Sequence, residues 1–353
     1  MSFERTKMMP NAVKTKISPP TPPPFPIPSS KSVIHLPADH YLHPTAQTEW
    51  WWHVGTLKAG HRTFGFEINA AAFYLNKVMF TQVMLTDVDN KVHYRQSTPR
   101  AVNAAWAEAD PKKNWWVKQG DPATESSWVT MNAPQADPSK NMVVKAAMVD
   151  EVSGKPIKFD LTFSQEGPPF IVWGTGVTAG NYYYSLTRLN ASGTVTIADE
   201  ALRVHGLTWM DHEYGQFGTP GAPVLWFLQD MQLDNGVHLS NFTVFTKPPS
   251  LDSTTDSNVT VQFPDGTTYY EQSKLTPFGR IWKSPQGTKF FLEFKIEIPA
   301  FHAALVVTSP VDGQDFPLPL LKADTYEGVA TASGTFMGHA THGTAWNEQQ
   351  PAG

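Results

Sequence analysis

Short runs of β-favouring residues, separated by turn signals, follow one another along the chain from Val33 onward. Residues 49–57, 63–73 and 78–88 are three such runs, and the intervening segments 58–61 and 89–91 contain the Gly and Asn residues that favour tight turns. Similar runs recur at residues 142–149, 194–197, 238–245, 289–298 and 304–309. No long segment shows sustained helical periodicity. The pattern therefore predicts an all-β chain of antiparallel meanders with only short helices.

The length of 353 residues suits two domains better than one. A weak internal repeat, W-x6-L-x2-G-x5-F, supports two similar halves, although four matches can also arise by chance. Its members are Trp50, Leu57, Gly60 and Phe66, repeated as Trp226, Leu233, Gly236 and Phe242. The repeat describes a strand with an inward Trp, a tight turn, and a return strand whose Phe can pack against that Trp. We expect duplicated barrels or half-barrels at residues 33–200 and 201–353.

A proline-rich segment precedes the first domain. Residues 19–30 read PPTPPPFPIPSS, which cannot donate the hydrogen bonds of a β-ladder. Residues 1–32 are therefore expected to form either a poorly ordered tail or an extended arm over a domain.

Charge and cysteine content narrow the partners and the compartment. Only 17% of the residues are charged and the formal net charge is -5, so nucleic acid is not expected as a partner and membrane contact is at most peripheral. The chain has no Cys, which excludes disulfides and thiolate sites. No apolar run reaches the length of a signal peptide or a membrane span. We expect a cytoplasmic location unless a leader was removed.

Aromatic residues are unusually abundant, with 12 Trp, 21 Phe and 10 Tyr. Aromatics are favoured on β-sheets and also line pockets for large apolar ligands, and both interpretations remain open. The glycine-rich loops that hold nucleotides are absent from the sequence, as is the G-x-S-x-G serine elbow. The pairs His40-x-x-His43 and His339-x-x-His342 have no third ligand marked by sequence. We therefore expect neither a cofactor nor a metal.

The segment Trp209-Met-Asp211-His212-Glu213 is the strongest candidate for chemistry. On a strand, Asp211 and Glu213 share one face and His212 takes the other. In an apolar cavity, desolvation and mutual repulsion raise the pKa of at least one carboxyl, which can then act as an acid near neutral pH. Hydration of an isolated alkene requires such an acid, and aromatic faces can stabilise the resulting carbocation.

Structural roles are possible for the same residues. The Asp-His-Glu run could form a hydrogen-bonded junction between domains, neutralised by Arg203 or Arg188. Glu49 could pair with Arg62 or Arg188. Trp51 lies on the opposite strand face from Trp50 and Trp52 and is expected in the core.

Several motifs, in order, resemble the two-domain, lipocalin-like family that contains the AttH-like proteins and the carotenoid 1,2-hydratases. They are Asp39 to Pro44 with Thr48-Glu49-Trp50-Trp51, then Tyr183-Tyr184-Ser185 with Arg188, then Trp209-Met-Asp211-His212-Glu213, then Trp226 with Gln232-Leu233-Asp234, and loosely Tyr326-Glu327-Gly328 with Glu348. The resemblance implies two lipocalin-like barrels packed together and carries the role of proton donor to Asp211. Trp52 and Tyr214 depart from the usual Tyr and Trp. Tyr182 and Tyr184 differ from the His and Trp that the carotenoid enzymes have near this position.

The combined hypothesis is a cofactor-independent enzyme acting on a small hydrophobic substrate such as a polyene, terpenoid or polyketide. Asp211 would start a hydration or cyclisation, with Glu213 or His212 orienting it or activating water. The residues expected to bind substrate are Glu49, Trp50, Trp52, Tyr182, Tyr184, Trp209, Tyr214, Trp226 and Gln232. Two alternatives remain, a pericyclase that works by preorganisation and a non-catalytic carrier of an apolar ligand.

Overall fold

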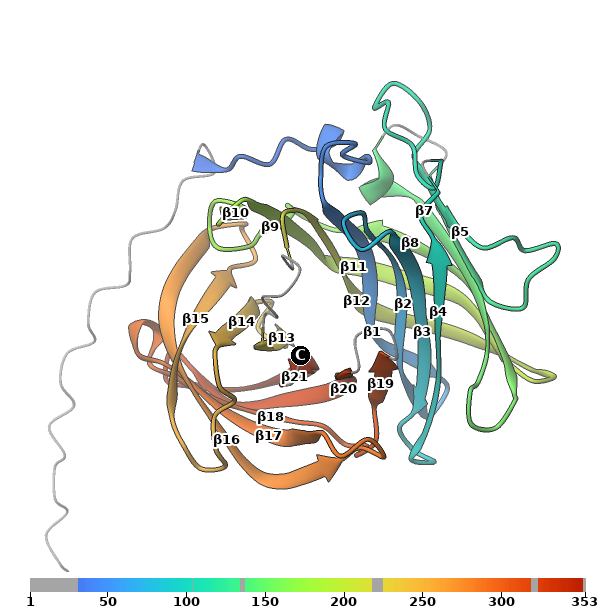
Figure 1. Ribbon diagram of the computed structural model, residues 1–353. Helices are drawn as coiled ribbons and strands as arrows, with labels where there is room; N and C mark the ends of the chain where they lie inside the picture. Colours follow the sequence, from blue (N-terminus) through green and yellow to red (C-terminus); the bar gives the residue numbers. More distant parts are fainter. Residues whose placement is uncertain (1–30, 104, 134–136, 218–224, 319–322, 352–353) are drawn as a thin grey trace, which may run out of the picture.

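The chain folds into two antiparallel β-sheets with very few helical residues (Figure 1). The computed structural model describes residues 31–103, 105–133, 137–217, 225–318 and 323–351. The predicted proline-rich arm, residues 1–32, lies outside these ranges except for its last two residues. The all-β prediction is confirmed.

Twelve strands form the first sheet, in the order β4-β3-β2-β1-β12-β11-β8-β7-β6-β5, with β9 and β10 pairing to β11 beside this path. Their bounds are β1 (Thr48–Ala59), β2 (Arg62–Phe73), β3 (Val78–Asp87), β4 (Val92–Ala101), β5 (Trp116–Gln119), β6 (Trp128–Asn132), β7 (Met142–Val149), β8 (Pro156–Gln165), β9 (Phe170–Ile171), β10 (Val177–Thr178), β11 (Asn181–Ile197) and β12 (Glu200–Gly215). Among the described strands, the end strands β4 and β5 do not pair with each other. The sheet is therefore a curled half-barrel.

Nine strands form the second sheet, and eight of them close into a barrel because β18 pairs with both β17 and β20. The strands are β13 (Leu225–Leu233), β14 (His238–Phe245), β15 (Thr255–Gln262), β16 (Thr268–Lys283), β17 (Lys289–Ile298), β18 (Ala303–Thr308), β19 (Asp315–Leu318), β20 (Ala323–Phe336) and β21 (His339–Gln350). Short 3-10 helices in the described ranges include η2 (Ala38–His40), η3 (Pro138–Lys140) and η4 (Pro299–Phe301). No helix in the described ranges is long and apolar enough to cross a membrane.

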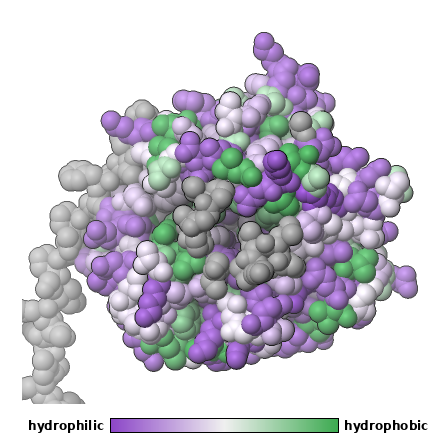
Figure 2. All heavy atoms as spheres, viewed as in Figure 1, coloured by the Kyte–Doolittle hydropathy of each residue, from purple (hydrophilic) through white to green (hydrophobic). Residues whose placement is uncertain are grey.

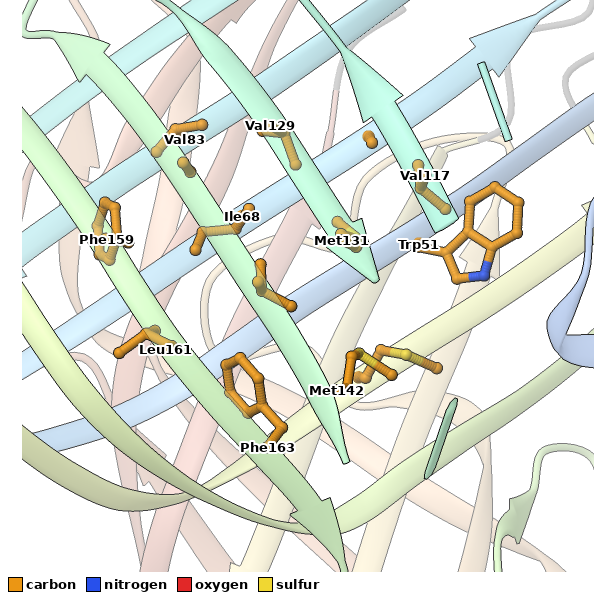
Figure 3. Close-up of a cluster of buried hydrophobic side chains, with 14 of the residues drawn as sticks. Trp51, Ile68, Val83, Val117, Val129, Met131, Met142, Phe159, Leu161 and Phe163 are labelled. Atoms are coloured by element: carbon orange, nitrogen blue, oxygen red, sulfur yellow. The ribbon is translucent and has the colours of Figure 1, made fainter. Parts of the chain in front are cut away.

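The concave face of the first sheet encloses its own hydrophobic core. Figure 3 shows part of this core, where Trp51 and Ile68 of the central strands lie with Val129, Phe159 and Phe163 of the strands that curl over them. Strand β8 alternates strictly between exposed and buried residues, as a half-buried strand should. The prediction that Trp51 belongs to the core is confirmed, because its side chain is fully buried there.

The central strands of the first sheet are buried on both faces, because the barrel covers the face opposite the hydrophobic core. Nine consecutive residues of β2, from Phe64 to Ala72, are buried, and β1 and β2 contact β21 and β20 of the barrel. The two sheets approach closely at Gly65, where a Cβ atom would lie only 2.4 Å from the Cβ of Val329. Arg95 also forms an ion pair with Asp315 across this junction, at 2.8 Å. The two sheets therefore pack directly against each other.

Two expectations need correction. The domain boundary expected at residue 200 falls inside the first sheet, because β12 pairs with β1 and β11 and extends that sheet to Gly215. The repeat does mark a hairpin in each domain, but its Phe does not meet its Trp: Phe66 lies opposite Gly55, and Trp50 instead stacks on Phe73 at 6.1 Å between ring centroids. The spacing of the repeat describes the hairpin and not the cross-strand register.

Candidate active site between the two sheets

Strand β12 separates two groups of polar side chains. Asp211 and Glu213 point toward the barrel. His212 points the other way, toward the core on the concave face of the first sheet, and contacts Glu49 and Tyr184. This arrangement confirms the alternation predicted from the sequence, because neighbouring residues on a strand face opposite sides.

Asp211 is held by hydrogen-bond donors from its own strand and the next. Its Oδ1 accepts hydrogen bonds from the Ser185 hydroxyl at 2.5 Å and from the Trp209 indole at 2.7 Å. The Tyr183 hydroxyl is a third donor. Burial raises the pKa of Asp211 to about 6, and the three donors limit that rise because they stabilise the charged form. Asp211 is therefore largely a carboxylate at neutral pH.

Glu213 lies on the same face and is equally buried, at 6% exposure for both carboxyl residues. Burial first, and then repulsion by Asp211 and Glu348, raise the pKa of Glu213 well above its usual value. Burial thus raises the pKa of both neighbours, and hydrogen-bond donors oppose that rise at Asp211. Such a pair of unequal carboxyls is a common arrangement for an acid and a base.

Four more acids join this pair, and the sequence patterns predicted no role for any of them. They are Glu67 on β2, Asp230 on β13, Glu327 on β20 and Glu348 on β21. Burial raises the pKa of all four, that of Glu348 to about 8. We refer to these four residues with Asp211 and Glu213 as the acid cluster. The sequence signals for these four acids were a single acid inside the apolar runs around Glu67 and Asp230, and the loose closing motif that contains Glu327 and Glu348.

Indole groups pair with members of the acid cluster. Besides Trp209 on Asp211, Trp226 donates to Glu348 at 2.6 Å and Trp346 donates to Glu327 at 2.9 Å. Burial dominates the raised pKa of Glu67, and Trp52 beside it partly offsets that rise. Tryptophan side chains from both sheets therefore surround the acid cluster.

The structure does not support neutralisation of these acids by arginine. Arg62 pairs with Asp87 and Glu200. Arg188 donates to the backbone oxygens of Gly236 and Phe263. Within the described residues, no Lys or Arg forms an ion pair with any member of the acid cluster.

A second polar group lies behind β12, on the concave face of the first sheet. Glu49 Oε1 lies 2.9 Å from His43 Nδ1 and 3.0 Å from His212 Nε2, and the Tyr184 hydroxyl lies 3.1 Å from His212 Nδ1. Burial opposes the charge on His43, but Asp39 and Glu49 raise its pKa to about 9, whereas burial lowers the pKa of His212 to about 4. Glu49 thus pairs with histidines and not with the arginines considered above.

His43, Glu49 and His212 form the one group of metal-ligand type found in the described ranges, with ligand atoms within 4.8 Å of one another. Both imidazole nitrogens point at the same carboxylate oxygen at hydrogen-bond distance. These contacts describe a hydrogen-bonded relay that fixes the ring of His212 behind Asp211 and Glu213. His43 also stacks on Tyr214 with 3.5 Å between ring centroids.

The predicted substrate-binding residues divide between the two faces. On the side of the acid cluster lie Trp50, Trp52, Trp209, Trp226 and Gln232. On the other side lie Glu49, Tyr182, Tyr184 and Tyr214, and also His212, which had been assigned to catalysis. The tyrosine that faces the acids is Tyr183, between the two that were predicted. A run of three tyrosines does not reveal its register, so the sequence could not tell which one faces the barrel.

Gln232 has a structural position at this junction. Its side-chain amide donates to the backbone oxygens of Thr187 and Thr208 at 2.7 and 2.9 Å. These contacts tie β13 to β11 and to β12, the strand that carries Asp211 and Glu213. The two sheets face each other in Figure 1, and Figure 2 shows the same side of the molecule with hydrophilic and hydrophobic residues intermingled on its surface.

A closed eight-stranded barrel packed on a curled half-barrel defines a lipocalin-type, two-domain β protein, and solved structures share this fold. A protein assigned to AttH from Nitrosomonas europaea (NE1406) is 18% identical with a TM-score of 0.71, covering 93% of this chain and 99% of that one. Kievitone hydratase from Nectria haematococca is 14% identical with a TM-score of 0.72, at 94% and 97% coverage. CghA with Sch210972 is 11% identical with a TM-score of 0.53, at 94% and 96% coverage. These identities establish the fold alone.

The sequence profile of the AttH-like family matches residues 27–348. The chain therefore belongs to the AttH-like family. No curated protein sequence matches it.

Proposed function

We propose that this protein is a cofactor-independent acid–base enzyme that hydrates or cyclises a carbon–carbon double bond of an apolar small molecule between its two sheets. The observation that carries the proposal is the placement of Asp211 and Glu213 together on one buried face of β12, where Ser185 and Trp209 donate to Asp211 and burial raises the pKa of Glu213. The hydratase name of one solved structure with this fold supports the same reaction type.

Glu213 is the better proton donor of the pair, which reverses the role carried to Asp211 by resemblance. A neutral Glu213 transfers its proton to one alkene carbon, a C–H bond forms, and the π electrons leave a carbocation on the other carbon. In hydration, water attacks that carbon and gives a proton to the Asp211 carboxylate. In cyclisation, a second double bond attacks, and Asp211 removes a proton from the cyclic cation. Return of the proton from Asp211 to Glu213 restores the starting state.

The tryptophan walls suit the cationic intermediate. An indole face stabilises a desolvated cation by about 1 to 2 kcal/mol. Trp52, Trp209 and Trp346 pack together in the cluster that separates the two sheets. The N–H groups of Trp209 and Trp346 donate to acids, so the orientation of these two rings is fixed before the substrate arrives.

Incubation of candidate polyenes and terpenoids with the full chain in heavy water tests this proposal. We expect products with solvent deuterium on carbon, and we expect loss of turnover in Glu213→Gln and in Asp211→Asn. Glu166→Gln, at an exposed position, is the matched control and should keep wild-type turnover. Product without deuterium would identify a pericyclase instead, and tight binding without product would identify a carrier. Near-normal turnover of Glu213→Gln would refute its role as the acid.

A further inference from the structure

The acid cluster presents free acceptors from both sheets. Both carboxyl oxygens of Glu67, Oδ1 of Asp230 and Oε1 of Glu327 are buried and have no hydrogen-bond partner within the described residues. Oδ1 of Asn69, two positions from Glu67 on β2, is also without a partner there. These residues are at most 3% exposed. Unsatisfied buried oxygens are costly, so their number at one place indicates a ligand group that satisfies them.

Few free donors lie around these acceptors, namely the Ser240 hydroxyl beside Asp230 and the Trp52 indole beside Glu67. The N–H groups of Trp209, Trp226 and Trp346 each donate to an acid of the cluster. A hydroxyl would bring lone pairs that need further donors, whereas an ammonium group brings up to three donors and no acceptor. The set of free groups therefore matches an ammonium better than a hydroxyl.

Charge favours the same chemistry. Six acids lie together, and none has a Lys or Arg partner in the part of the chain that the structure describes. The members influence one another across the junction, since Glu327 is repelled by Glu348, Glu67 and Asp211. Indole faces around carboxylates form the kind of site that binds organic cations. A bound cation would thus attract the carboxylates of the acid cluster and offset the repulsion between them.

We infer that the substrate of the interdomain site carries a basic nitrogen and binds as an ammonium ion, with Glu67, Asp230 and Glu327 as its acceptors. This inference rests on the proposal that the substrate occupies the space between the two sheets. Glu67 lies on the first sheet and the other two acids on the barrel, so the ammonium would bridge the domains. Asp211 and Glu213 would remain free for the chemistry.

Calorimetric titration of the full chain with three matched probes tests this assignment. The probes are 2-phenylethylamine, 2-phenylethanol and phenylacetate, which share a ring and differ only in the polar group. We expect the amine to bind at least about tenfold more tightly than the alcohol, and phenylacetate to bind more weakly still. Repeating the titration in buffers of different ionisation enthalpy should show about one proton released per amine bound, because an acid that is neutral in the free protein must ionise. Equal affinity for the alcohol, or no measurable heat with the amine, would overturn the inference.

Isosteric variants locate the site. Glu327→Gln and Asp230→Asn should each weaken binding of the amine by about tenfold and leave the affinity for the alcohol unchanged. The exposed control Glu166→Gln should change neither affinity. A near-ultraviolet circular dichroism spectrum identical to wild type establishes that each variant is folded. If both variants bind the amine like wild type, the acceptors are wrongly assigned. If amine binding depends on Glu327 but no deuterated product forms, this inference holds and the proposed reaction is refuted. The inference and the proposed reaction can therefore fail independently.

Discussion

Replacing Asp211 by Asn should make the protein more stable at neutral pH, although the change removes a proposed catalytic group. The folded protein raises the pKa of Asp211 from 3.8 to about 6. Each pKa unit corresponds to about 1.4 kcal/mol, so the charged form of Asp211 is disfavoured in the folded state by about 3 kcal/mol. Because the folded pKa is raised, the stability from this group is present below about pH 4 and is lost as the pH rises through about 6.

Asn keeps an oxygen that can accept from Ser185 and Trp209 and carries no charge. We therefore expect Asp211→Asn to raise the free energy of unfolding by about 2 to 3 kcal/mol near pH 7, and by less than about 1 kcal/mol near pH 4. Urea unfolding followed by tryptophan fluorescence measures both values. The control Asp199→Asn, at an exposed position in the turn before β12, should show no such pH-dependent gain. A variant destabilised equally at both pH values would refute the view that Asp211 is a desolvated carboxylate.

Three further predictions concern the junction and the relay behind β12. Gly65→Ala should destabilise the protein by about 1 to 3 kcal/mol because its Cβ would collide with Val329, and the added change Val329→Ala should restore most of the loss in urea unfolding. Gln232→Leu leaves two buried carbonyls without their donor and should lower the unfolding free energy by about 2 kcal/mol, whereas an unchanged midpoint would count against its role at the junction. Since Asp39 and Glu49 outweigh burial and raise the pKa of His43 to about 9, the stability from its charge should be lost as the pH rises from about 6.5 through 9, and thermal unfolding of His43→Gln should show a flatter profile in that window.

The sequence predicted the features that depend on local periodicity. The alternation in β8, the hairpins that turn at Gly60 and Gly236, and the opposite faces of Asp211 and His212 all follow from the two-residue repeat of a strand. The domain boundary was wrong because β12 is continuous in pairing with β1, and local sequence does not show which sheet a strand joins.

The acid cluster could not be assembled from the sequence for a related reason. Glu67, Asp230, Glu327 and Glu348 come from four strands of two sheets and meet only when the barrel packs on the half-barrel. Glu67 and Asp230 are single acids in mainly apolar runs, and Glu327 and Glu348 lie in mixed surroundings, so each one alone is weak evidence for any role. That Tyr183 faces the acids, and not Tyr182 or Tyr184, likewise depends on the register between β11 and β12.

Alternate residues of β12 face the barrel and the core of the first domain, which has a practical consequence for mutagenesis of this protein. Positions 209, 211 and 213 can be varied as one library that alters the reacting surface, because their side chains do not enter the core of the first domain. Positions 210, 212 and 214 anchor that core through Met210 packing, the His212 contact with Glu49, and the Tyr214 stack on His43. Deleting one residue from this strand would exchange the two sets, so that carboxylates would enter the core and an imidazole would face the barrel. The strand therefore tolerates new chemistry on alternate positions while its length stays fixed.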